Sequence, residues 1–235
     1  MGRTWEVWAV SGSPSIAPLY PNPPYEYRGS RMITVLLDGA APHDVLPVGL
    51  EQPQAPSRVV VFADYPDTTI GPYREVVVLV GADRQASPGL FCPLIYVDSD
   101  AALCAGREIW GFPKKLADIE VEQDGNAVRA RLVRGGVELL TLSGSVTEHV
   151  DPATLAALGA LPIYNRKLIP GVASKEADVD RLTQVYLDIV TKEAAVGTGV
   201  LRGAGEGAIV VGDAHQVSFF ATLADSVLPA GEDVR

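Results

Sequence analysis

Short apolar runs of strand length dominate the first half of the chain. Four of them, dense in Val, Ile, Phe and Tyr, occupy residues 32–38, 58–65, 74–82 and 89–97. Turn-forming residues, such as PDTTIGP after the second run, separate them. Alternating or continuous apolar runs rich in β-branched and aromatic residues are typical of strands. We therefore expect a mainly β protein (α+β, with few helices) whose connections are of hairpin length.

The second half continues the pattern with AVRARLV, VELLTLSGSV, AIVVG and QVSFFATL, which also predict strands. Two segments favour helices instead. DSDAALCAGREIWG offers Asp98 or Ser99 as an N-cap and ends at Gly111. DPATLAALGAL has an aspartate at the capping position and a proline at the first helical position.

The chain shows no repeat, no low-complexity tract and no strong linker. We expect a single domain over residues 1–235, in which residues 1–27 form an extended, Pro-rich lead-in. Apolar residues make up 47% of the chain and charged residues 20%, which argues against disorder.

The charge balance narrows the possible partners. Lys and Arg total 19 against 29 for Asp and Glu, so the net charge is −10 and no nucleic-acid partner is expected. The N-terminus has no apolar core of signal-peptide length, and no apolar stretch of membrane-spanning length follows. We expect a soluble, cytoplasmic protein with no membrane partner.

The candidate metal ligands are scattered. Cys92 and Cys104 lack metal-site spacing and are expected to be buried, inert thiols, and His43, His149 and His215 lie far apart in sequence. No motif indicates a nucleotide, flavin or haem. We therefore expect neither a metal nor a cofactor.

Lys114 and Lys115 are the most informative residues, because two cations adjoin the apolar stretch WGFP in an acidic chain. In an extended segment neighbouring side chains point to opposite faces, so only one lysine can enter a given pocket. An amine that is desolvated or next to another cation loses its proton more easily and can condense with a ketone. The resulting imine accepts the electron pair released when CO₂ or a proton leaves. A solvated surface pair is the alternative.

The segment GREIWGFPKKLA (residues 106–117) resembles the signature of the acetoacetate decarboxylase family, in which a helix ending in Gly-Arg-Glu leads into Pro-Lys-Lys-Leu. This resemblance implies that Lys114 forms the Schiff base and that Lys115 activates it, the family being a known example of a lysine activated by a cationic neighbour. It also implies an antiparallel, cone-like β-barrel that encloses a pocket, and a homo-oligomer.

Two further segments extend the resemblance over about residues 25–133. GPYREVVVLV resembles a family strand whose turn ends in Tyr-x-Glu, which implies that Glu75 is an active-site carboxylate. YEYRGSRMITVLLDG resembles the family's Arg-bearing strand; Arg28 is the favoured active-site arginine and Arg31 the competing candidate.

One departure from the family changes the functional prediction. The family carries a second glutamate in the strand before the Tyr-x-Glu turn, and RVVVFADY places Val60 or Val61 there, with Asp64 as a possible substitute. Trp110 and Phe112 are expected either in the core or as walls of the lysine pocket.

Three hypotheses about function remain open. The first is a Schiff-base lyase that decarboxylates a small β-keto acid, and the second is an aldolase–dehydratase that uses the same lysine on pyruvate-like substrates. The third is a non-catalytic barrel that binds a small ligand.

Overall fold

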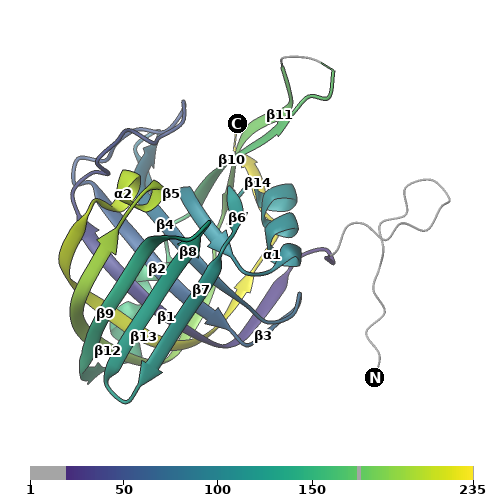
Figure 1. Cartoon of the computed structure of the whole chain (residues 1–235). Coiled ribbons are helices and arrows are strands. Elements are labelled where there is room, and N and C mark those ends of the chain that lie inside the picture. The colour runs from purple at the N-terminus through teal and green to yellow at the C-terminus, as the bar shows by residue number, and fades with distance from the viewer. Residues whose placement is uncertain (1–19, 174–175, 235) are drawn as a thin grey trace, which may run out of the picture.

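The computed structural model describes residues 20–173 and 176–234, and these residues are mainly β (Figure 1). The strands of the first half are β1 (Tyr25–Asp38), β2 (Ser57–Tyr65), β3 (Asp67–Thr68), β4 (Tyr73–Arg84), β5 (Ser87–Val97), β6 (Lys114–Leu116) and β7 (Asp118–Asp124). Those of the second half are β8 (Ala127–Arg134), β9 (Val137–Val150), β10 (Ile163–Pro170), β11 (Ala177–Val185), β12 (Asp188–Gly203), β13 (Ala214–Leu228) and β14 (Glu232–Val234).

The 14 strands of the described residues belong to one sheet, in the order β14-β11-β10-β5-β4-β2-β1-β13-β12-β9-β8-β7, with β3 paired to β1 and β6 paired to β5. Neighbouring strands are antiparallel except where β5 meets β10 and β6. The mainly β prediction is confirmed. The predicted closure into a barrel is not, because within the described chain the strand path runs from β14 to β7 without returning to its start.

Each of the four apolar runs of the first half falls inside a strand, namely β1, β2, β4 and β5. The strand predicted for AIVVG is wrong, because these residues lie in helix α2 (Glu206–Val211). Gly207, Val210 and Val211 are the buried residues of α2, and this i, i+3, i+4 spacing is helical. An apolar run this short cannot be assigned from periodicity alone.

The two predicted helices are both present in modified form. DPATLAALGAL forms the 3₁₀ helix η2 (Pro152–Gly159). The other begins as α1 (Asp100–Ala105), whose N-cap is Ser99, and continues as the π-helical turn η1 (Gly106–Trp110). Gly111 ends the turn with a left-handed φ of 78°, a conformation that suits glycine.

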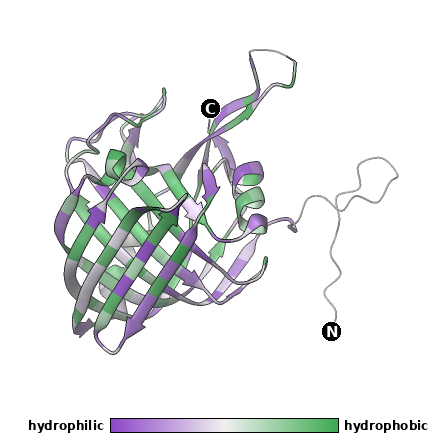
Figure 2. Ribbon diagram, viewed as in Figure 1, coloured by the Kyte–Doolittle hydropathy of each residue, from purple (hydrophilic) through white to green (hydrophobic). Residues whose placement is uncertain are grey.

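The sheet has an apolar cluster on each face, because successive strand residues point to opposite sides. On β2, Val60 and Phe62 pack into the larger cluster, whereas Val59 and Val61 face the second. On strands with one solvent-facing side, such as β8, hydrophilic and hydrophobic residues alternate instead (Figure 2). The candidate site lies on the face of the second cluster.

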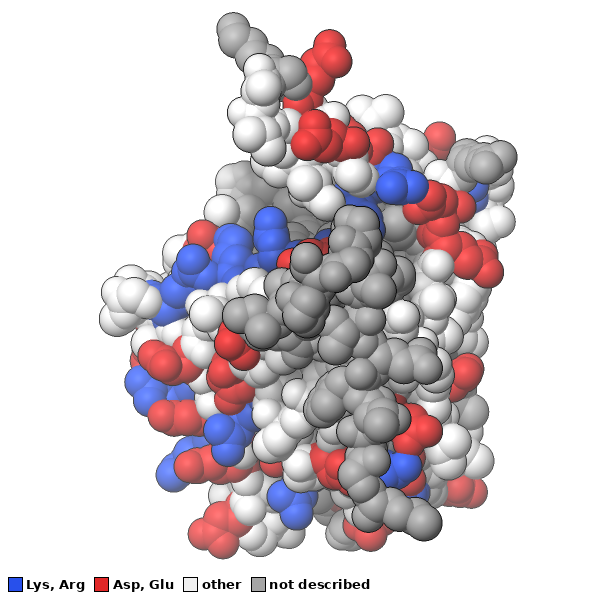
Figure 3. All heavy atoms as spheres, turned by 90° about the vertical axis from the view of Figure 1, so that its right-hand side faces the viewer, with Lys and Arg blue, Asp and Glu red and all other residues white. Residues whose placement is uncertain are grey.

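Most charged side chains lie at the surface. Acidic and basic groups are interspersed on the face shown in Figure 3. Several charged side chains form exposed ion pairs, such as Arg166 with Asp180 and Arg131 with Glu138. No helix in the described ranges has both the length and the apolar character needed to cross a membrane.

Candidate active site

The Nζ atom of Lys114 lies 2.7 Å from Oε2 of Glu75, and both side chains are buried, with 7% and 8% of each residue exposed. The rings of Tyr73 and Phe112 lie 5.5 Å and 5.8 Å from Nζ. A buried amine is strongly destabilising unless it is paired and hydrogen-bonded. Glu75 provides that partner from β4, so the two groups depend on each other.

The turn between η1 and β6 delivers Lys114 to this position. After Gly111 reverses the chain, β6 runs parallel to β5 and sets Lys114 beside Ile95. The backbone N–H of Lys114 donates to the carbonyl of Phe112 at 2.7 Å, and the Arg107 guanidinium donates to the Lys114 carbonyl at 3.3 Å. The turn is therefore held by its own backbone and by the helix that precedes it.

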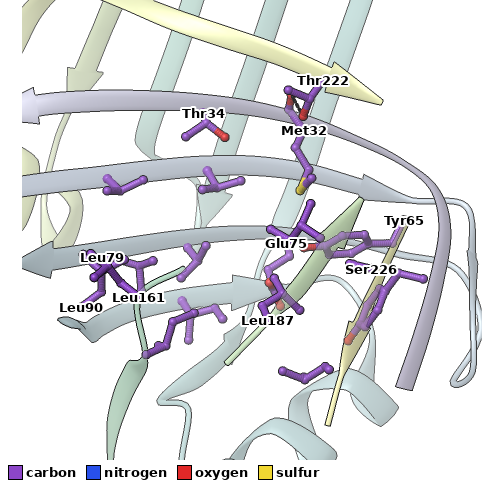
Figure 4. Close-up of a pocket in the computed structure, with 18 of the residues that line it drawn as sticks. Met32, Thr34, Tyr65, Glu75, Leu79, Leu90, Leu161, Leu187, Thr222 and Ser226 are labelled. Atoms are coloured by element: carbon purple, nitrogen blue, oxygen red, sulfur yellow. Dashed lines mark hydrogen bonds between the residues drawn. The ribbon is translucent and has the colours of Figure 1, made fainter. Parts of the chain in front are cut away.

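Lys114 and Glu75 open onto a cavity of about 370 Å³ (Figure 4). Its walls are mostly aliphatic and include Val59, Val61, Val77, Leu79, Leu90 and Ile95. Among the described lining residues the charged side chains are Lys114, Glu75 and Asp188, of which Asp188 is exposed. A reactant here meets one amine and one buried carboxylate in a space whose walls are mostly aliphatic.

Three tyrosines, Tyr27, Tyr65 and Tyr73, pack together beside the amine–carboxylate pair, with ring centroids 4.9–6.4 Å apart. The Tyr73 hydroxyl donates to the Tyr27 hydroxyl at 3.3 Å. Burial raises the pKa of all three, and the nearby negative charge of Glu75 raises it further. Their hydroxyls therefore stay protonated and can donate hydrogen bonds to an anionic reactant.

Lys115 points to the opposite face of β6. Its Nζ lies 2.5 Å from Oε2 of Glu206 and 5.6 Å from the ring centroid of Tyr96. Hydrogen bonds from Lys115 and from the Tyr96 hydroxyl lower the pKa of Glu206. The expected repulsion between the two lysines must therefore act across the strand, and the charge of Glu206 offsets it.

Neither candidate arginine reaches the cavity of this chain. The Arg28 guanidinium pairs with Glu26 at 2.5 Å, and that of Arg31 lies 3.9 Å from Asp64; both are exposed. Arg31 shares the sheet face of Ile33, opposite to Met32, which lines the cavity. The pairing of β1 with β13 shifts its register between Tyr27 and Ser30, the segment that contains Arg28. Arg28 and Arg31 therefore do not line the cavity, and an active-site role for either stays a prediction.

The other candidates divide between cavity and core. Val61 and Phe112 line the cavity, whereas Val60 lies in the larger cluster on the far face of the sheet. Trp110 is buried outside the cavity, where its indole N–H donates to the carbonyl of Pro229 at 2.9 Å. Asp64 is paired with Arg74 at 3.4 Å and does not line the cavity, so it does not replace the missing glutamate.

The family model described as "Acetoacetate decarboxylase (ADC)" matches residues 11–206. The chain belongs to the acetoacetate decarboxylase family. An acetoacetate decarboxylase of Ralstonia nicotianae is 30% identical over 229 residues, which cover 94% of this chain and 92% of that protein. Because its homologues are acetoacetate decarboxylases, the chain is an enzyme of the lyase class.

Solved structures of other proteins share the fold. The acetoacetate decarboxylase of Legionella pneumophila superposes with a TM-score of 0.84 at 26% identity, over 95% of this chain and 92% of that one. The enduracididine biosynthesis enzyme MppR, solved with the condensation product of pyruvate and imidazole 4-carboxaldehyde, superposes with a TM-score of 0.74 at 18% identity. The match covers 92% of this chain and 91% of MppR, and at this identity it shows the fold alone.

No site role was predicted from the sequence for the three tyrosines, although Tyr73 is the tyrosine of the Tyr-x-Glu motif. None was predicted for Gly106 either, whose Cα lies against the side chain of Lys114. Tyr65 and Tyr73 flank the PDTTIGP turn, and Tyr27 lies on the neighbouring strand, so strand pairing would have been needed to bring them together.

Residues 20–173 and 176–234 contain no group of three or more His, Cys, Asp and Glu side chains placed to hold a metal.

Proposed function

We propose that the chain is a Schiff-base decarboxylase of a β-keto acid, with Lys114 as the nucleophile. The observation that carries this proposal is the buried pair of Lys114 Nζ and Glu75 Oε2, 2.7 Å apart at one side of an apolar cavity. The pair combines an amine that can attack a ketone with a carboxylate that can accept the proton the amine must lose.

The proposed reaction uses these two groups in sequence. The Lys114 amine adds to the ketone carbon, water leaves and a protonated imine forms. The bond between the α-carbon and the carboxylate then breaks, CO₂ departs, and the bonding pair moves through the new carbon–carbon double bond to the imine nitrogen. Glu75, as its conjugate acid, returns a proton to the α-carbon, and hydrolysis of the imine releases the ketone and the free amine.

The apolar walls favour the decarboxylation step. A carboxylate that leaves water for such a cavity loses solvation, whereas the CO₂ that it becomes is neutral and loses little in the same transfer. The tyrosine hydroxyls supply hydrogen bonds that orient the carboxylate without the strong fixed charge of an arginine.

The proposal predicts CO₂ release from acetoacetate, and Lys114→Ala should abolish it. Lys192→Ala is the matched control, because Lys192 is an exposed lysine paired with Asp225 and does not line the cavity. The control should release CO₂ at the rate of the unmodified chain. Equal CO₂ release by Lys114→Ala would remove Lys114 from the reaction.

The aldolase–dehydratase reaction is a second candidate, and Val61 is the observation that favours it. Val61 lines the cavity where the family's second glutamate is expected, and a cavity of about 370 Å³ has room for two small reactants. Pyruvate offered with an aromatic aldehyde would then give a dehydrated condensation product without CO₂. Mass spectrometry of the same incubations distinguishes the two reactions, and binding without turnover of either kind would indicate a ligand-binding protein.

A further inference from the structure

The cavity continues well beyond the reacting amine, along one face of the sheet. On β4, Glu75, Val77 and Leu79 are alternate residues that all line it. With a rise of about 3.4 Å per strand residue, Glu75 and Leu79 are roughly 14 Å apart along the strand. A small acid held at Lys114 would therefore occupy only the first part of this length.

Strand pairing organises the floor of the cavity into three rows. The head row contains Met32 and Glu75, which flank Ala63 on the strand between them. The middle row contains Thr34, Val61, Val77 and Ile95. The distal row contains Leu36, Val59 and Leu79.

The three rows differ sharply in polarity. Glu75 of the head row, with Tyr65 and Ser226, lies toward one end of the cavity, whereas Leu79, Leu90 and Leu161 gather toward the other (Figure 4). Lys114 continues the middle row on β6 and directs its Nζ to Glu75 in the head row. Apart from Lys114, the middle and distal rows on β1, β2, β4 and β5 carry no charge, and their one polar side chain is Thr34. The Lys114 ammonium and the hydroxyls of the three tyrosines can hold the carboxylate of a substrate near the head row, whereas the distal row offers it no polar partner.

We infer that the substrate is a β-keto acid with an extended apolar chain on the far side of its ketone, and that this chain lies along the middle and distal rows. The inference rests on the proposed function, because it takes the ketone carbon to be held at Lys114. At about 30 Å³ for each water-sized group, a cavity of about 370 Å³ holds on the order of a dozen such groups. That is room for a keto acid head and a chain of several carbon atoms.

The residues at the rim of the cavity favour an uncharged chain and disfavour a second acid group on the substrate. Asp188 is exposed and negatively charged, and would repel a second carboxylate. Leu36, Leu161 and Ile189 line the cavity while 36–43% of each remains exposed. A bound alkyl chain would cover this apolar surface, which water otherwise contacts.

The inference predicts a chain-length series for acetoacetate, 3-oxohexanoate, 3-oxooctanoate and 3-oxodecanoate. Since burial of a methylene group favours binding about fourfold, kcat/KM for CO₂ release should rise by roughly 15-fold for each two added carbons until the distal row is filled. A kcat/KM that is highest for acetoacetate, or equal along the series, would overturn the inference.

A second readout separates this inference from the proposed function. The product ketones acetone, 2-pentanone, 2-heptanone and 2-nonanone can form an imine with the same lysine, and borohydride traps it without any decarboxylation. Trapping that rises with chain length supports the apolar extension even if no keto acid releases CO₂, in which case the decarboxylase proposal alone fails. Trapping that is flat or falls with chain length overturns the inference, whichever reaction the enzyme performs.

Val59→Trp locates the chain, because it places a large side chain in the distal row. It should lower kcat/KM for 3-oxodecanoate at least tenfold relative to acetoacetate. Val137→Trp is the control: Val137 lies on β9, is 49% exposed and does not line the cavity. An unchanged ratio in a folded Val59→Trp variant would contradict this placement; should that variant fail to fold, the series on the unmodified chain still decides the inference.

Discussion

The side chain of Lys114 lies directly against the Cα of Gly106, where a Cβ atom would come within 2.5 Å of Cδ and 2.6 Å of Cε. Gly106 begins the π-helical turn η1, and π-helical turns are frequent at functional sites. The presence of glycine in the Gly-Arg-Glu segment thus has a physical explanation: its backbone, which carries no side chain, is the surface along which Lys114 reaches Glu75.

Gly106→Ala should displace Lys114 without unfolding the protein, because the clash is with a side chain that can rotate. A shift of about 1 Å in a reacting group can cost on the order of a hundredfold in rate, so we expect imine formation to slow by at least tenfold. Trapping kinetics with borohydride and a thermal melt measure the two effects.

Gly125→Ala is the control for Gly106→Ala. Gly125 has a left-handed φ of 54°, and no neighbouring atom lies within 4 Å of the position that a Cβ atom would take, so alanine there should cost about 1 kcal/mol in stability. Its imine formation should match that of the unmodified chain. Full-rate trapping by Gly106→Ala would contradict the role given to this glycine.

Glu75→Gln keeps the size of the side chain and removes its ability to accept a proton. General acid–base catalysis contributes about 10²–10⁴-fold, so kcat for CO₂ release should fall within that range. Glu138→Gln, which removes an exposed carboxylate paired with Arg131, should leave kcat unchanged. A Glu75→Gln variant as fast as the control would show that the proton moves by another route.

Lys115 and Glu206 should shift the pH dependence of imine formation in opposite directions. Lys115→Ala removes a cation near the nucleophile, so half-maximal trapping should move to higher pH. Glu206→Gln leaves the cation uncompensated and should move it lower. The pair is partly exposed and solvent screens it, so each shift should stay below about one pH unit. Loss of trapping at every pH in Lys115→Ala would show that both amines are essential.

Local residue preferences and the resemblance to a family predicted different parts of the molecule. The strands β1, β2, β4 and β5 were predictable because long apolar runs rich in β-branched residues carry a strong local preference. Lys114 and Glu75 were predicted as site residues through the resemblance to a family, and the structure brings their side chains together. The chemical role of each residue stays a prediction.

The remaining site features depend on pairing and parity, which a single sequence does not contain. Val60 and Val61 are chemically identical, and only the register of β2 sends Val61 into the cavity. On β1, alternation places Arg31 on the face opposite the cavity-lining Met32, and Arg28 lies beside Asp67 of β3. The alternation of side chains predicted that one lysine alone would enter the pocket, but Glu206, distant in sequence, could not be foreseen as the partner of the other.

The tyrosines predict a loss of stability in alkali. Because burial raises the pKa of Tyr27, Tyr65 and Tyr73, the folded state holds these protons more tightly than the unfolded chain, whose tyrosines titrate near pH 10. Their contribution to stability is fully present below about pH 10 and is lost as the pH rises further. Tyrosinate absorbance and circular dichroism, followed together, should change in one cooperative step. Ionisation of these tyrosines near pH 10 with an unchanged dichroism spectrum would contradict the burial.

Covalent capture of Lys114 tests the central claim most directly. The protein is incubated with acetoacetate and borohydride, digested, and its peptides are weighed by mass spectrometry. We predict a reduced adduct on the peptide that contains Lys114, its absence in Lys114→Ala, and its presence in Lys192→Ala. An adduct on another lysine, or none with any keto acid or ketone of the series, would contradict the account.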